Sequence, residues 1–206
     1  MMKICGILAV AGLAASANAT PSASIDLQVS TDGSTWTNSV SVLPGTVVHC
    51  AIFVSVTDAY GFGGATITAL TGSGAAAGDS AAFGAGTSTG RVAPFNFGAV
   101  TNAIFAVAGG FRIDASSDGG NSNTAAGMTF SQRDPATAEP GTYMDGTAAR
   151  MAFAFDVTVG GDVSLRTIQM AFGNLVRGVA TVHTSSSASR GTHGSNERLE
   201  FLGDRV

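Results

Sequence analysis

The chain has 206 residues, 28 of them glycine, and a formal net charge of −4 at pH 7. Glycine is about twice as frequent as the roughly 7% usual in proteins, which disfavours a helical bundle. Hydrophobic residues make up 45% of the chain, which is enough for a core and disfavours wholesale disorder. Because the charge is acidic and Lys3 is the only lysine, nucleic acid and anionic membranes are not expected as partners. The arginines are scattered singly, a pattern typical of a solvated surface.

The first 19 residues have the features of a secretory signal peptide. Lys3 supplies the positive start, residues 4–15 form a short apolar run, and Ala17-Asn18-Ala19 presents small residues to signal peptidase. The run is too short to span a bilayer, and no later apolar stretch is long enough, so no transmembrane segment is expected in the mature chain. We expect a mature protein that begins at Thr20 and is secreted, to the cell surface, the extracellular space or the periplasm.

Alternation of apolar and polar residues predicts strands separated by turns. Ile25, Leu27 and Val29 indicate a first strand, and Asp32-Gly33 follows as a turn signal. Further strands are predicted at 46–57, 62–70, 150–159, 163–172 and 175–182. Within 163–172 the apolar phase shifts, which predicts a bulge near Arg166 and Thr167.

Two of these strands are long enough for the alternation to assign faces. In 46–57, Cys50 shares the apolar face with other aliphatic residues; once the signal is removed it is the only cysteine, so an intramolecular disulfide is impossible. In 150–159, Met151 and Phe155 are predicted to face the core and Asp156 to face solvent. Stability must then come from the hydrophobic core.

Long segments rich in glycine, alanine, serine and threonine, at 71–90, 115–127 and 184–196, are predicted to be mobile loops. Residues 75–83 and 100–107 could each form one or two helical turns. The whole pattern predicts an all-β fold, a two-layer antiparallel β-sandwich of jelly-roll or immunoglobulin type. Residues 20–182 would form this single domain, and 183–206 a polar, flexible C-terminal segment.

The stretch from Val42 to Val56, with its Pro44-Gly45 turn and valine-rich strand, is followed by Gly61-Phe62-Gly63-Gly64-Ala65. This order resembles the opening of cohesin-like modules of secreted bacterial proteins, which have an immunoglobulin-type β-sandwich. Residues 149–165 are similar to the strand, turn and strand that close such a module. The resemblance implies that a sheet face binds a protein partner, next to 61–65 or through the outward residues of 149–159.

With its signal peptide, the chain also resembles the glycine-rich surface proteins of planctomycete-type bacteria. Many of those proteins carry a C-terminal sorting tail of the Pro-Glu-Pro type. This chain ends in Glu200-Phe201-Leu202-Gly203-Asp204-Arg205-Val206, which has neither the apolar helix nor the arginine cluster of that tail.

The segment Ser30–Trp36 is similar to the Asp-box hairpin of sialidase-type propellers, in which an aspartate caps a tight turn above a packed tryptophan. One copy is present, and the spacing from Asp32 to Trp36 is one residue short, so a hairpin with a packed tryptophan is preferred to a propeller. The alternative to a purely structural role for Trp36 is that it stacks on sugar in a carbohydrate-binding module. It requires Trp36, Tyr60 and Phe62 to lie coplanar on one exposed face.

Metal-binding and catalytic patterns are weak. Asp114, Asp118, Asn121 and Asn123 form an oxygen-rich cluster that could hold calcium, although it departs from the EF-hand pattern and also suits a flexible polar loop. The three histidines, His49, His183 and His193, lack the spacing of a zinc site. No other cofactor is expected.

One short motif, Gly78-Asp79-Ser80, resembles the nucleophile block of secreted esterases. Such an esterase needs an aspartate three residues before its histidine, and this chain has Arg190 before His193. No catalytic residue is therefore assigned. We expect a secreted, non-catalytic, cohesin-like interaction or structural module with an extracellular protein or polysaccharide as partner; a carbohydrate-binding module is the first alternative and a secreted hydrolase the second.

Overall fold

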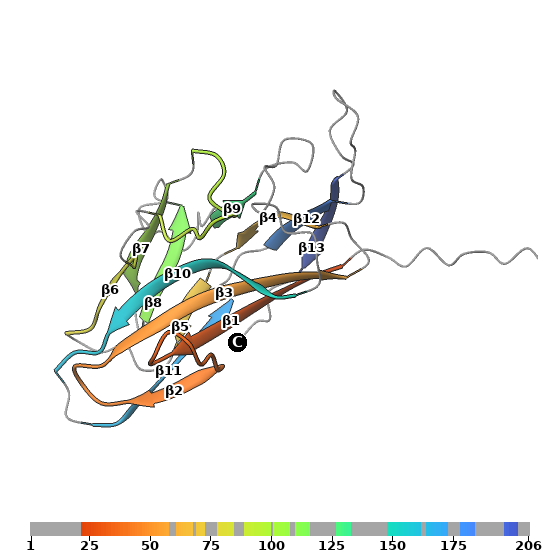
Figure 1. Cartoon of the computed structure of the whole chain (residues 1–206). Coiled ribbons are helices and arrows are strands. Elements are labelled where there is room, and N and C mark those ends of the chain that lie inside the picture. The colour runs from red at the N-terminus through yellow and green to blue at the C-terminus, as the bar shows by residue number, and fades with distance from the viewer. Residues whose placement is uncertain are drawn as a thin grey trace, which may run out of the picture.

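The computed structural model describes most of the chain between residues 22 and 201 (Figure 1). This described part is all-β: it consists of antiparallel strands in three sheets and contains no helix, so no helix there could cross a membrane. The predicted signal peptide lies outside it. The described residues are 22–57, 61–67, 69–72, 78–84, 89–99, 101–107, 110–115, 127–132, 148–161, 164–172, 178–183 and 196–201.

The first sheet, called sheet A, has the order β1-β3-β10-β6. Its strands are β1 (Ser22–Ser30), β3 (Val47–Thr57), β10 (Arg150–Thr158) and β6 (Ser80–Ala82). Strand β3 pairs with β1 along one edge, from Ser22 opposite Thr57 to Ser30 opposite His49, and with β10 along the other. These three strands therefore form a continuous antiparallel platform.

The other two sheets are assembled from strands that are distant in sequence. Sheet B has the order β2-β11-β5-β8-β7, and sheet C has the order β13-β12-β4-β9. The strands of sheet B are β2 (Ser39–Val42), β11 (Arg166–Phe172), β5 (Ala69–Gly72), β8 (Gly110–Ala115) and β7 (Asn102–Val107). Those of sheet C are β13 (Asn196–Phe201), β12 (Gly178–His183), β4 (Gly61–Ile67) and β9 (Met128–Ser131).

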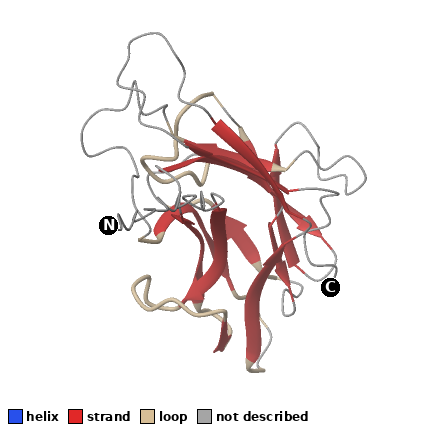
Figure 2. Ribbon diagram, turned by 90° about the vertical axis from the view of Figure 1, so that its right-hand side faces the viewer, coloured by secondary structure: helices blue, strands red, loops and turns tan. Residues whose placement is uncertain are grey.

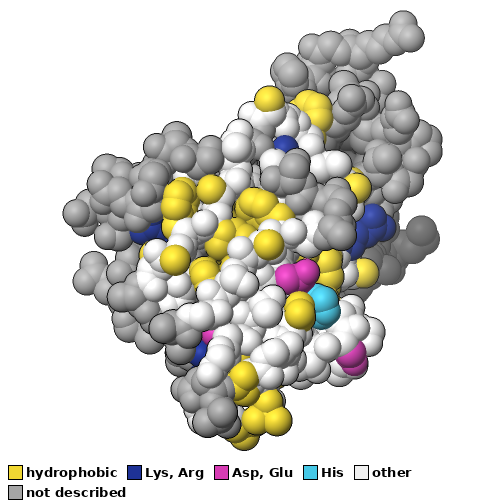
Figure 3. Space-filling model, turned by 90° about the vertical axis from the view of Figure 1, so that its left-hand side faces the viewer, with side chains coloured by type: hydrophobic (Ala, Val, Ile, Leu, Met, Phe, Trp, Pro, Cys, Tyr) yellow, Lys and Arg dark blue, Asp and Glu magenta, His cyan; other side chains and the backbone are white. Residues whose placement is uncertain are grey.

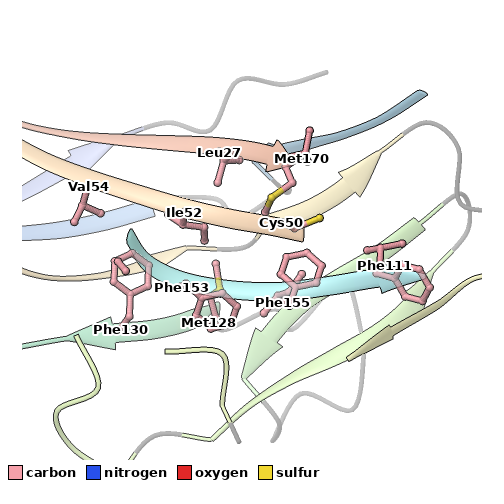
Figure 4. Packing of buried hydrophobic residues seen from close by; sticks show 14 of the residues in the cluster. Leu27, Cys50, Ile52, Val54, Phe111, Met128, Phe130, Phe153, Phe155 and Met170 are labelled. Carbon is pink, nitrogen blue, oxygen red and sulfur yellow. The ribbon is translucent and has the colours of Figure 1, made fainter. Parts of the chain in front are cut away.

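One hydrophobic core receives side chains from all three sheets, which Figure 2 shows around a shared interior. Figure 4 shows Cys50, Ile52 and Val54 of β3 on the same side of the sheet as Phe155 of β10. Three buried aromatic rings, Phe62, Phe95 and Phe130, contact one another, with centroids 5.8–6.4 Å apart. The core-facing residues alternate along β3, as burial of one sheet face requires, whereas five consecutive residues of β8 are buried. The other labelled members of the core in Figure 4 are Leu27, Phe111, Met128, Phe153 and Met170.

The strands predicted from strict alternation are confirmed, whereas the two predicted helical stretches are wrong. Residues 102–107 form β7, which pairs with β8 throughout its length, and residues 80–82 form β6. In both places cross-strand main-chain bonds outweigh a short helical periodicity, because one or two turns of helix are hardly stable alone. The single strand predicted at 62–70 is divided into β4 and β5, which belong to different sheets.

The bulge lies in a different strand from the one predicted. The register between β10 and β3 shifts between Met151 and Phe153, so Met151 lies opposite Phe53 and is half-buried instead of joining the core. In the predicted place the structure has no register shift: β11 begins at Arg166, and Leu165 precedes it with 65% of its surface exposed. The change of apolar phase there marks the start of a strand.

The C-terminal segment also differs from the expectation of a flexible tail. Strand β13 pairs with the whole of β12, from Gly178 opposite Phe201 to His183 opposite Asn196. The tail therefore supplies an edge strand of sheet C.

Removal of the Phe155 ring tests the register of β10. Phe155 is 1% exposed, so Phe155→Ala should lower the free energy of unfolding by about 3–5 kcal/mol through lost burial and a cavity. Asp156→Ala, on the other face, should cost only about 0.5 kcal/mol because its hydrogen bond with His49 is partly exposed to solvent. Denaturant titration of both variants checks the assignment, and equal losses would contradict it.

The thiol of Cys50 should be inert in the folded protein. Burial raises the pKa of this thiol, and the Asp156 carboxylate adds to the effect. We expect no reaction with a thiol reagent at pH 8 until denaturant unfolds the chain, because only the thiolate reacts. Time-resolved labelling followed by mass spectrometry is the measurement. Rapid labelling of the folded protein would show that Cys50 lies on the solvent-exposed face of β3.

Candidate functional site

The face of sheet A that points away from the core carries the candidate site. Alternation along β3 sends Cys50, Ile52 and Val54 into the core and turns His49 and Phe53 outward. We call this the outer face of sheet A; it comprises Asp26 and Gln28 of β1, His49 and Phe53 of β3, and Met151, Asp156 and Thr158 of β10, with Trp36 packed on Phe53.

A histidine and an aspartate are hydrogen-bonded on this face. The register places His49 directly opposite Asp156, and Nδ1 of His49 lies 2.7 Å from Oδ1 of Asp156. Because an ionised carboxylate only accepts, Nδ1 carries the proton and donates it. Their side chains are 37% and 35% exposed, so solvent reaches the pair. Figure 3 shows a face on which a histidine lies next to acidic side chains, among hydrophobic ones.

The turn after β1 covers one end of this face and is held by Asp32. Its Oδ1 accepts hydrogen bonds from the main-chain N–H groups of Ser34 and Thr35, both at 2.7 Å, and Oδ2 accepts the hydroxyl of Thr35. These bonds hold the pKa of the Asp32 carboxyl far below its usual range. Gly33 occupies the left-handed region, with φ of 71°, and a Cβ atom there would lie 3.6 Å from Cδ2 of His49.

Trp36 completes the candidate site. It is half-buried, and its ring meets that of Phe53 edge to face with centroids 5.3 Å apart. This confirms the predicted turn with a capping aspartate and a packed tryptophan. Because the tryptophan is only half-buried, part of it remains open to a ligand.

Ser30, His49 and Asp156 lie in one row across three neighbouring strands. The row has the residue types of a serine hydrolase triad, but the hydroxyl of Ser30 donates to Oδ1 of Asp32 at 2.9 Å and not to His49. Ser30 is also fully buried. A hydrolytic triad requires the serine to be bonded to its base and open to substrate, so this row does not have that geometry.

The aromatic platform predicted for sugar binding is not formed as expected. Phe62 is fully buried, because its ring packs against Phe95 and Phe130 in the core, so its prediction as an exposed residue is wrong. Tyr60 lies outside the described residues. Of the three aromatics, Trp36 alone is seen with an accessible ring.

Of the four residues predicted as a possible calcium site, Asp114 lies in the part of the chain that the structure describes. Asp114 lies in β8, is fully buried, and accepts hydrogen bonds at Oδ1 from the N–H groups of Ala115 and Gly127. Its Oδ2 lies 3.4 Å from Nε of Arg112, which supplies a cation from the protein itself. Asp118, Asn121 and Asn123 lie outside the described residues, and within the described part no three potential metal ligands are grouped together.

The esterase-like motif has a structural role in the folded chain. Asp79 is buried and binds Arg166 through two hydrogen bonds, of 2.6 and 3.0 Å, while Oδ1 also accepts the N–H of Gly160. A side chain at Gly160 would collide with the main chain of Gly78. Ser80 begins β6 opposite Thr158. The motif therefore ties the start of β6 to the loop after β10.

The expectation that the arginines are all solvated is also wrong. Arg91 is buried, and its guanidinium donates to the carbonyl oxygens of Phe97 and Gly98; burial lowers its pKa. Arg112 is buried next to Asp114. Arg91 fixes the loop that follows it, and Arg112 is paired with Asp114 within β8.

The sequence did not reveal the pairing of His49 with Asp156. Both residues fall on the outward side of strands that the alternation predicts correctly, so that signal was present. The partners are 107 positions apart, and their contact depends on the register between two strands.

Comparison with known proteins adds no relative. No protein-family model matches the chain, and no similar protein was found among curated sequences or solved structures.

The bonds of Asp32 predict a pH dependence. Since its folded-state pKa is lowered, the carboxylate stabilises the protein above its unfolded pKa of about 3.9, and this contribution is lost as pH falls through the folded value. Asp32→Asn should therefore lower Tm at pH 7, and the difference from wild type should shrink in strong acid. Thermal unfolding from pH 7 to pH 2 is the measurement, and a difference that grows in acid would contradict the assigned bonds.

Proposed function

We propose that the chain is an exported, non-catalytic β-sandwich module that binds an extracellular partner through the outer face of sheet A. The signal-like first 19 residues support export. One core shared by three antiparallel sheets is consistent with two packed layers, as in the cohesin-like modules that the sequence resembles. The fold and the residue pattern thus favour the same class of protein.

The single observation that carries the proposal is the make-up of the outer face. A hydrogen-bonded His49–Asp156 pair and the Trp36–Phe53 pair are held on regular strands and a rigid turn, with His49, Asp156 and Trp36 only partly buried. Interfaces obtain most of their affinity from a few preorganised aromatic and hydrogen-bonding side chains. A protein partner is the first choice, because the arrangement combines an aromatic ring with polar groups on a sheet surface.

A polysaccharide is the second candidate, favoured by the accessible part of Trp36. An aromatic ring next to a carboxylate and an imidazole offers an apolar face to sugar C–H groups and hydrogen-bonding partners to hydroxyls. This alternative depends on Trp36 alone among the predicted aromatics, since Phe62 is buried.

The test is binding of the purified protein to cell-surface extracts and to a glycan array, compared with two charge variants. Asp156→Arg alters the outer face of sheet A, whereas Gln169→Arg places the same side chain at an exposed position of β11 in sheet B. We expect Asp156→Arg to abolish capture of the partner and Gln169→Arg to leave it unchanged, with circular dichroism showing that both are folded.

Two results would overturn the proposal. Equal loss of binding in both variants would show that the outer face of sheet A is not the binding site. Reproducible hydrolysis of a glycan or ester, abolished by one serine or acid substitution that leaves folding intact, would indicate a secreted hydrolase instead.

A further inference from the structure

The free edge of β1 is a second surface, which borders the proposed binding site and shares Asp26 with it. Strand β1 is the outermost strand of sheet A and spans Ser22–Ser30, longer than any other strand at a sheet edge in the described part of the chain. Its register with β3 is unbroken, and it contains no proline, lysine or arginine. Natural edge strands are usually protected by short length, bulges, proline or lysine, and β1 has none of these.

The main-chain bonds of Val29 show which groups point to this edge. Val29 donates to the carbonyl of Thr37 at 2.7 Å and accepts its N–H at 2.9 Å, on the side away from β3. Alternate residues of a strand direct both main-chain groups to the same side. The N–H and C=O groups of Ala23 and Ile25 therefore point to the free edge, where no described strand pairs with them.

The side chains of this edge are also incompletely covered. Ala23 and Ile25 are half-buried and pack against the core, while Ser24 and Asp26 between them are exposed. A strand added here would complete the burial of Ile25 and extend the sheet. The half-covered aliphatic residues thus mark the edge as one that gains from a further strand.

We propose that a second copy of this chain occupies the edge, with β1 pairing antiparallel to β1 of its partner about a two-fold axis at Ile25. In an antiparallel pair, the main-chain N–H and C=O groups of both hydrogen-bonded residues must point to the shared edge. Only alternate residues of β1 meet this condition, which restricts the possible registers. Centring on Ile25 places Ile25 opposite its copy and Ser24 opposite Asp26 of the other chain, twice by symmetry. Each serine hydroxyl then faces a carboxylate that accepts it.

The neighbouring registers are less favourable. If the partner strand is shifted by two residues, so that the two-fold axis lies at Asp26, the Asp26 residues of the two copies are opposite each other. Like charges directly opposite each other are destabilising. The opposite shift shortens the paired segment. Centring on Ile25 joins the two copies of sheet A into one continuous sheet, so both outer faces lie on the same surface.

The test is self-association of the purified protein, followed by sedimentation velocity from micromolar to millimolar concentration. The wild-type chain should form a dimer. Ser24→Asp should weaken it by about tenfold, because two like-charge pairs arise, and Ser24→Lys should strengthen it by pairing with Asp26. Ser41→Asp is the matched control, an exposed serine on edge strand β2 of sheet B, and should leave the dimer unchanged.

Amide hydrogen exchange supplies the second readout. The Ile25 N–H should become protected as concentration rises, whereas that of Ser24, already directed toward β3, should not change. A chain that stays monomeric at millimolar concentration would overturn the proposal, as would equal effects of Ser24→Asp and Ser41→Asp. Protection of Ile25 only on addition of an extended peptide such as Thr-Val-Arg-Val-Thr-Val-Thr would assign the edge to another protein.

Discussion

The pairing of β3 on both of its edges is the constraint on which the described structure depends. Through this pairing, one alternating strand supplies Cys50 and Ile52 to the core and His49 and Phe53 to the opposite face. A slip of one residue would exchange the two faces, so the same register that completes the core also assembles the outer face. Core and surface are therefore not independent in sheet A.

Buried charged side chains fix segments between the strands, in addition to apolar contacts such as those of Phe95. Arg91 binds the main-chain carbonyls of Phe97 and Gly98, and Arg166 binds the carboxylate of Asp79. Removing one partner of such a contact leaves a charge without compensation in a poorly solvated place, which costs more than the contact itself contributes. A chain rich in glycine and alanine thus obtains defined loops from a few arginines.

Local alternation predicted much of the fold but little of the candidate site. Cys50 and Phe155 are buried as expected, because their positions depend only on a period of two within one strand. The hydrogen bond between His49 and Asp156 depends on which strands are neighbours, a property of the whole topology. Phe62 was misassigned for the same reason: its burial depends on contacts with Phe95 and Phe130, which are distant in sequence.

The attachment of β6 by Asp79 has a thermodynamic consequence. This three-residue strand is joined to the sheet by main-chain bonds to β10 and by the contacts of Asp79 with Arg166 and Gly160, and Ala81 is its only residue packed against the core. An opening limited to residues 80–82, with Phe83 still packed on Phe153, would expose little apolar surface, so it should have a small heat-capacity change and a weak dependence on urea. At this edge, cold and mild denaturant would leave the strand in place.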